Sequence, residues 1–191
     1  MHIIKYKFRR FVEPRYHLPK TQDAISVGIL SPFSYDFSTI SLGPLSIYHA
    51  INRDSNCPGI ADRIFTYDPL LDESGNILSN LELQQKLPTF EKRIPLNKLN
   101  LICISLTNTD AVTKALQLLQ LGGIPLKKSD RQSGNYPLIL AGGPGCVNPE
   151  IFADFFDFFS IGDGCVLAKN IVNSIHILLT QNKKSICYKC I

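Results

Sequence analysis

The chain has 191 residues, of which 45% are hydrophobic and 19% charged, and its formal net charge is +4. A chain of this length forms one domain, with or without an appendage, and buries enough surface to fold without disulfides or metals. The composition excludes global disorder, and the sequence contains no apolar run of about 18 residues that could cross a membrane.

The positive charge is concentrated at the N-terminus. Six of the 20 lysines and arginines stand in the first 20 residues, where Glu13 is the one acidic residue. We therefore divide the chain into a basic arm over residues 1–23, a domain over residues 24–182 and a tail over residues 183–191. An arm with interleaved aromatic residues can bind nucleic acid, but a solvated leader that packs on the domain or on a neighbour is the favoured interpretation. No nucleic-acid partner is expected.

The N-terminus also bears on the compartment. Residues 1–20 alternate charged and aromatic side chains and never form the apolar stretch of a secretory signal. We therefore expect a cytoplasmic protein whose six cysteines are reduced. Cys187 and Cys190 are spaced like half of a zinc or redox site, but without a second pair they are better interpreted as spare thiols.

Short apolar runs of strand length alternate with helical patterns along the chain. The predicted strands are residues 24–30, 62–67, 99–106, 137–141 and 155–161. The predicted helices are one entered through Pro44, a possible one at residues 78–87, one capped by Thr109 or Asp110 and ending at Gly122, a short piece at residues 148–154, and one that follows Gly164. Residues 32–40 and 126–136 are predicted to be loops.

This alternation predicts the fold class. The strands lack regularly spaced polar positions, which is typical of strands covered on both faces. We therefore expect an α/β fold of the Rossmann or flavodoxin type, an open parallel sheet with helices on both faces.

Small and hydroxyl-bearing residues follow the predicted strands, and in such sheets ligands bind outside the carboxyl ends of the strands. Residues 31–38 follow the first strand. The candidate binding residues after the later strands are Ser105, Thr107, Gly142, Gly143, Pro144, Gly162, Asp163 and Gly164. Any one glycine motif is more often a simple turn, but together these tips predict a shallow site for a broad, flat ligand.

Several familiar sites are missing. The first strand-to-helix turn carries no Gly-x-Gly-x-x-Gly and no Walker lysine, which disfavours a nucleotide site. No serine stands in a nucleophile elbow, and His49 beside Tyr48 is more typical of a packed or surface histidine than of a base. We predict no catalytic residue and no metal ligand in this chain.

Three segments resemble the N-terminal cobalamin-binding domain of cobalamin-type radical SAM proteins. They are residues 42–51 (LGPLSIYHAI), 104–126 and 138–164 (the last beginning LILAGGPGCVNPE), and the similarity extends over about residues 14–180. The resemblance implies a Rossmann-like domain that holds the corrin over the edge of the sheet. By this resemblance, Ser105 and Thr107 lie near the nucleotide tail of cobalamin. The tail passes beside Gly142, Gly143 and Pro144. The family's last turn corresponds to Gly162, Asp163 and Gly164.

This chain departs from the pattern in three ways. Cys165 replaces the glutamate usual in the last turn. None of the four histidines follows an aspartate by two residues, so bound cobalamin would have no histidine ligand from this chain. No three cysteines have the Cys-x-x-x-Cys-x-x-Cys spacing that holds a radical SAM cluster.

The expected function follows from these departures. We expect a cobalamin-binding accessory domain that is not catalytic by itself. The [4Fe–4S] cluster and S-adenosylmethionine would belong to a missing or partner barrel domain, so that the chain is a truncated or split member of a radical SAM enzyme. The alternatives are a degenerate scaffold or interaction module that has lost cobalamin, and a small flavodoxin-like enzyme or flavin carrier.

Overall fold

The computed structural model describes residues 20, 22–66, 87–132 and 134–180. The described residues form one sheet of five parallel strands in the order β2-β1-β3-β4-β5. The strands are β1 (Ile25–Ser34), β2 (Gly59–Thr66), β3 (Leu101–Ser105), β4 (Leu138–Gly142) and β5 (Phe158–Ser160). The predicted open parallel sheet is confirmed.

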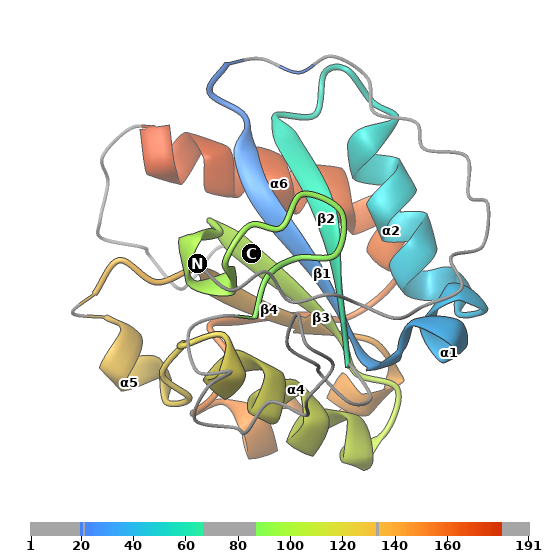
Figure 1. Ribbon diagram of the computed structural model, residues 1–191, viewed down its shortest axis with the longest axis vertical. Coiled ribbons are helices and arrows are strands. Elements are labelled where there is room, and N and C mark those ends of the chain that lie inside the picture. The colour runs from blue at the N-terminus through green and yellow to red at the C-terminus, as the bar shows by residue number, and fades with distance from the viewer. Residues whose placement is uncertain (1–19, 21, 67–86, 133, 181–191) are drawn as a thin grey trace, which may run out of the picture.

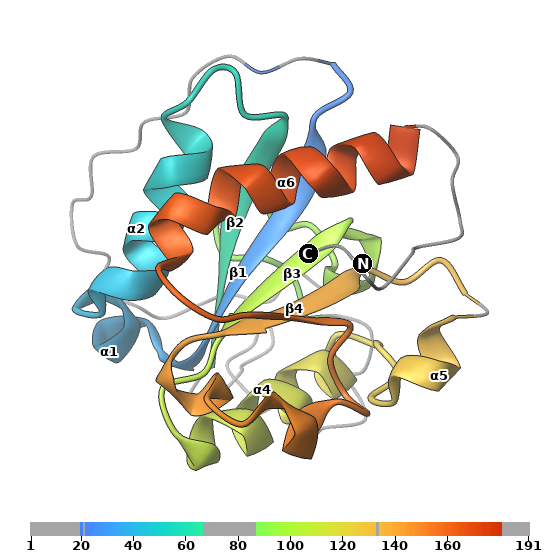
Figure 2. The ribbon, with the colours of Figure 1, turned by 180° about the vertical axis from the view of Figure 1, so that it is seen from behind.

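Helices cover both faces of this sheet (Figures 1 and 2). The helices are α1 (Tyr35–Thr39), α2 (Leu42–Asn52), α4 (Thr109–Leu121), α5 (Lys128–Arg131) and α6 (Gly164–Thr180), with 3-10 turns η1 (Leu96–Lys98), η2 (Pro144–Cys146) and η3 (Pro149–Phe152). Helices α2 and α6 lie on one face and α4 on the other. Among the described residues, no helix is both long enough and apolar enough to span a bilayer.

The core forms because side chains alternate between the two faces along each strand. On β1, Val27 and Ile29 pack towards α2 and α6, whereas Leu30 packs in the cluster that includes α4. Strand β1 is central, and its Val27 is paired with Ala61 of β2 and with Leu101 of β3. Burial on both faces explains why these strands are almost continuously apolar.

The first strand is longer than predicted. It runs through Pro32 to Ser34, and residues 35–39 form the short helix α1, so the prediction of a loop over residues 32–40 is wrong. The pairing of β1 with β2 shifts between Leu30 and Ser34, which is a bulge-like irregularity. A proline, which has no N–H to donate, is tolerated in a strand at such a point.

Smaller differences concern the ends of elements. Strand β2 begins three residues earlier than predicted, and β5 is shorter than residues 155–161. Asn108, and neither Thr109 nor Asp110, caps α4, because its side chain accepts a hydrogen bond from the N–H of Ala111 at 2.9 Å. The loop predicted over residues 126–136 contains the single turn α5. The helix predicted at residues 78–87 lies outside the described residues except for its last position, Leu87, which is buried.

Lys20, the last basic residue of the predicted arm, is fixed against the domain. Its ammonium group donates to the carbonyl oxygens of Ile51 at 2.8 Å, of Cys57 at 3.3 Å, and of Asp54. Burial lowers the pKa of this ammonium group. Cations near the C-terminal end of a helix are stabilised by its dipole and by its unpaired carbonyls, so Lys20 is a structural anchor for the end of α2.

Candidate functional site

The strand order places a topological switch point between β1 and β3. The chain leaves β1 for α2 on one face, and it leaves β3 for α4 on the opposite face. Diverging connections open a crevice at the carboxyl ends of the two strands, and this is where open α/β sheets bind ligands.

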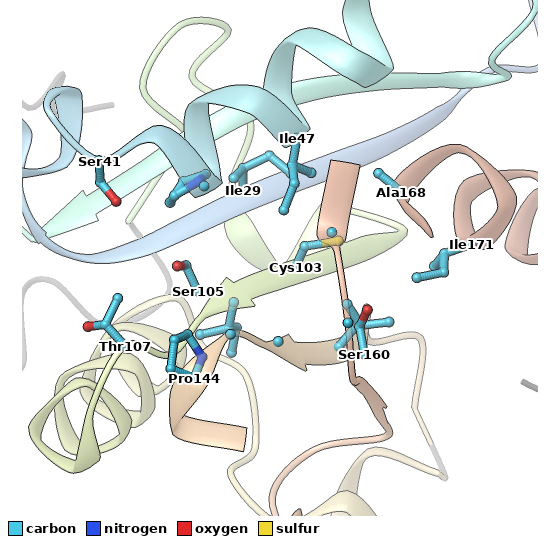
Figure 3. Close-up of a pocket in the computed structure, with 18 of the residues that line it drawn as sticks. Ile29, Ser41, Ile47, Cys103, Ser105, Thr107, Pro144, Ser160, Ala168 and Ile171 are labelled. Atoms are coloured by element: carbon cyan, nitrogen blue, oxygen red, sulfur yellow. The ribbon is translucent and has the colours of Figure 1, made fainter. Parts of the chain in front are cut away.

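A cavity of about 350 Å³ lies at this place, between the carboxyl ends of the strands and helices α2 and α6. Figure 3 shows β3 beneath it and α2 above it. Its lining is drawn from β1, β3, β4 and β5 and from the two helices; the residues are Ile29, Ser41, Gly43, Pro44, Ile47, Ile51, Cys103, Ile104, Ser105, Thr107, Leu140, Gly142, Gly143, Pro144, Ser160, Gly162, Gly164, Ala168 and Ile171. This volume falls at the lower end of the range for small-molecule sites, about 300–1,000 Å³.

The cavity has an apolar floor and a polar mouth. The floor consists of buried side chains from both the sheet and the helices, among them Ile51, Leu140 and Ile171. Thr107 and Pro144 are exposed at the mouth. Figure 3 shows these two residues with Ser41 at one end of the cavity, and Ile171 at the other. Among the described lining residues, none has a charged side chain. The cavity therefore suits a neutral group with an apolar inner end and a polar outer end.

Seven of the eight predicted site residues line this cavity. They are Ser105, Thr107, Gly142, Gly143, Pro144, Gly162 and Gly164. Asp163 does not line it, because it is exposed and caps α6: its carboxylate accepts a hydrogen bond from the N–H of Cys165 at 2.8 Å. Sequence positions up to 59 residues apart, Ser105 and Gly164, are thus brought to one rim, as expected for tips of neighbouring parallel strands.

The hydroxyl groups of residues 31–38, which were predicted to follow the first strand, do not line the cavity. Ser31 and Ser38 are buried and hydrogen-bonded to each other at 2.8 Å, and neither lines the cavity. The predicted contribution of residues 31–38 to the rim is therefore wrong. The extension of β1 to Ser34 makes Ser31 part of the strand, so it is not a residue of the loop that follows the strand.

Four hydroxyl groups face the cavity and are available to a ligand. They belong to Ser41, Ser105, Thr107 and Ser160, and none of them is hydrogen-bonded to another side chain or main-chain group of the described residues. Ser41 is informative because it occupies the N-cap position of α2 without capping it. N-cap serines ordinarily accept a hydrogen bond from the first turn, so this hydroxyl is left for another partner.

Cys103 is the only thiol in the described lining. It lies on β3, partly exposed to the cavity, and burial raises its pKa to about 12. A thiol with so high a pKa stays protonated at neutral pH and is a poor nucleophile. Cys103 therefore contributes a small, weakly polar surface.

The two glycines after β4 have different reasons to be glycine. Gly143 has φ +109, and a Cβ there would approach the carbonyl oxygen of Leu106 to 2.6 Å, so the fold itself requires glycine. At Gly142 a Cβ would make only ordinary contacts, the nearest at 3.4 Å from the carbonyl oxygen of Ser160. Gly142 lines the cavity, so the side chain it lacks would occupy space that the cavity now has.

Sequence reasoning missed the half of the site that the helices supply. Gly43 and Ile47 come from α2, Ser41 is the N-cap residue of that helix, and Ala168 and Ile171 come from α6. The Ser-Leu-Gly-Pro stretch at the start of the helix was the signal in the sequence for this half of the site. A glycine in the first turn of a helix has no side chain and can therefore leave room for a ligand. His49 and His176, the two described histidines, do not line the cavity, and His176 is paired with Asp23 at 3.0 Å.

Comparison with known proteins identifies the family of this chain. The family model described as "Radical SAM proteins, N-terminal" matches residues 43–188. Neither the search of curated proteins nor the search of solved structures gave a significant match. The match begins at the start of α2 and includes every strand except β1. By this match over most of its length, the chain belongs to the family of N-terminal domains of radical SAM proteins.

Proposed function

We propose that this domain binds cobalamin, with no histidine ligand from the described chain, and serves a radical SAM catalytic domain. The uncharged base and ribose of the nucleotide tail would occupy the cavity, and the single anionic phosphodiester of the tail would lie at the polar mouth. Cobalamin, when bound, would supply a redox-active cobalt centre to that partner. The observation that carries the proposal is a cavity at the β1/β3 switch point whose described lining is uncharged, with an apolar floor and a hydroxyl-bearing mouth.

The lining fits the tail of cobalamin better than a free nucleotide. A flat, uncharged aromatic base suits the apolar floor, and a ribose suits the hydroxyl groups of Ser105 and Thr107 near the mouth. Ligands with several phosphates are usually held by lysine, arginine or glycine-rich loops, and no basic side chain belongs to the described lining. The cavity is too small for a whole corrin, which would remain outside the mouth.

Exposed apolar side chains follow the carboxyl ends of β1, β4 and β5 and support a partner domain. Ile40 and Leu42 follow β1, Val147 follows β4, and Ile161 and Val166 follow β5, each with 63% or more of its surface exposed. Isolated exposed apolar residues are common, but several at one edge of a sheet are typical of an interaction surface. Membership of a family of radical SAM N-terminal domains implies association with a catalytic domain, and we propose that it docks at this edge.

The runner-up is a scaffold that no longer binds cobalamin. It is favoured by Gly143, since the conformation of that glycine is explained by Leu106 without any ligand. It does not explain why Gly142 leaves space in the cavity, or why the hydroxyl group of Ser41 at the same cavity makes no cap hydrogen bond.

The test compares two corrins. The full chain is mixed with hydroxocobalamin or with cobinamide, which lacks the nucleotide tail, and passed through gel filtration. We expect corrin absorbance to elute with the protein for hydroxocobalamin and much less for cobinamide. Protein that stays colourless with both supports the scaffold, and equal retention of both refutes a tail in the cavity. Retention of flavin mononucleotide in place of either corrin would support the flavin carrier.

A matched pair of variants locates the binding. Gly142→Val places a side chain where only ordinary contacts exist, so we expect a folded protein with a filled cavity and weakened retention. Ile177→Ala removes an exposed apolar side chain near the C-terminal end of α6, outside the cavity and away from its mouth, and should retain hydroxocobalamin like the unsubstituted chain. Far-UV circular dichroism confirms that both variants are folded.

A further inference from the structure

Gly43 occupies the first turn of α2, where the fold does not require a glycine. It is not among the described glycines with positive φ, and a Cβ built on it would meet no heavy atom within 4 Å. Glycine in a helix is less favourable than alanine because it loses more conformational freedom on folding. Gly43 therefore makes α2 harder to form, and no contact within the described chain explains its presence.

The other glycines of the cavity provide the contrast. Gly143 and Gly162 have φ +109 and +128, which L side chains rarely adopt. At Gly164 a Cβ would approach the side chain of Ile47 to 2.8 Å. These three are explained by the backbone or by packing. Gly43 and Gly142 both line the cavity, and at neither position would a Cβ come closer than 3.4 Å to another part of the fold.

The surroundings of Gly43 show which part of the cavity it controls. Gly43 is exposed and lines the cavity, so it belongs to the mouth. Two residues earlier, the hydroxyl of Ser41 makes no cap hydrogen bond, and Pro44 follows without an N–H. Figure 3 places Ser41 at the same end of the cavity as Thr107. The start of α2 thus presents a bare backbone and a free hydroxyl on one side of the opening.

We infer that Gly43 is a specificity-determining position: it keeps the mouth open, and the ligand occupies the space beside its α-carbon. The inference rests on the proposed function, because it concerns the same cavity and the same ligand. It predicts that added bulk at position 43 weakens binding in proportion to its size while the domain itself becomes no less stable.

The experiment uses the full chain with Gly43→Ala and Gly43→Leu, and Ser46→Ala as the control. Ser46 lies on the same helix but does not line the cavity, and its replacement also raises helix propensity. We expect Gly43→Ala and Ser46→Ala each to raise the Tm by about 1–4 °C. Retention of hydroxocobalamin, measured as a Kd by absorbance titration, should weaken several-fold for Gly43→Ala and at least tenfold for Gly43→Leu, and stay unchanged for Ser46→Ala.

The outcomes separate the inference from the proposed function. If the unsubstituted chain does not bind hydroxocobalamin, the proposed function fails and the inference fails with it. If the unsubstituted chain binds and both Gly43 variants bind equally well, only the inference is overturned. A lower Tm for Gly43→Ala would also overturn it, since the glycine would then be required by the fold.

Discussion

A buried pair of carboxyl groups, Asp62 on the edge strand β2 and Glu91 in the segment packed against it, makes the stability of this domain depend on pH. The carboxylate of Asp62 accepts hydrogen bonds from the hydroxyl of Thr89 at 2.6 Å and from the N–H of Lys92 at 2.7 Å. The guanidinium of Arg63 donates to the carboxylate of Glu91 at 2.6 Å, and both side chains are almost fully buried. These contacts hold the segment around Glu91 against the edge strand.

The pKa of Glu91 sets the size of the effect. Burial, a hydrogen bond shared with Asp62 and the negative charge of Asp62 raise the pKa of Glu91 from 4.5 to about 7, although Arg63 opposes the rise. The folded state therefore binds the proton more tightly than the unfolded state does. The stabilisation is complete below about pH 4.5 and is lost as the pH rises to about 7, a change of about 3 kcal/mol in the free energy of unfolding.

Glu91→Gln tests this effect, because glutamine resembles the protonated acid and does not titrate. The free energy of unfolding is measured by urea denaturation between pH 5 and pH 8 for both proteins. We expect the variant to gain stability relative to the unsubstituted chain as the pH rises, by up to about 3 kcal/mol at pH 8. Glu150→Gln, which removes an exposed carboxylate, should show no such trend. A stability difference for Glu91→Gln that stays constant over this range would refute the reasoning.

Three further substitutions probe contacts that hold the fold. Arg131→Met removes the guanidinium that donates to the buried carboxylate of Asp157 at 3.1 Å. We expect the free energy of unfolding, measured by urea denaturation, to fall by about 3–5 kcal/mol. A fall below about 1 kcal/mol would show that the pair contributes little to stability. Gly143→Ala should lower the free energy of unfolding by about 1–3 kcal/mol, because the new Cβ strains the backbone and collides with the carbonyl oxygen of Leu106. An unchanged Tm would contradict this. Asn52→Ala removes a buried side chain that both donates to and accepts from the main chain of β2, at 3.0 and 2.9 Å, and should cost about 1–3 kcal/mol; hydrogen exchange at β2 that is no faster than in the unsubstituted chain would argue against it.

The central elements were predictable because their signals are local. The apolar run at residues 99–106 contains β3, and the stripe of apolar residues that follows it predicts α4. The course of β1 through Pro32 was not predictable, because a proline normally ends a strand and only the shifted pairing with β2 accommodates it.

The candidate site was predictable in part for the same reason. Ser105 and Gly142 follow apolar runs, and parallel strands bring their carboxyl ends to one edge, so the shared rim follows from the fold class. The absence of Ser31 from that rim goes with the extension of β1 to Ser34, and that extension involves a shifted pairing with the distant strand β2. The helical lining from Gly43 and Ile171 also depends on how α2 and α6 pack on the sheet, and no local pattern specifies that packing.

The sequence by itself determined the alternation of strands and helices and the placement of small and hydroxyl residues at strand ends, because hydrophobic periodicity and turn residues act over short distances. Only the tertiary structure decided the strand order, and with it the switch point between β1 and β3 where the cavity opens. It also decided that the backbone conformation at Gly143 requires glycine, whereas a Cβ could be accommodated at Gly43 and Gly142. The reason is that the room for a Cβ depends on which atoms of distant residues surround the position.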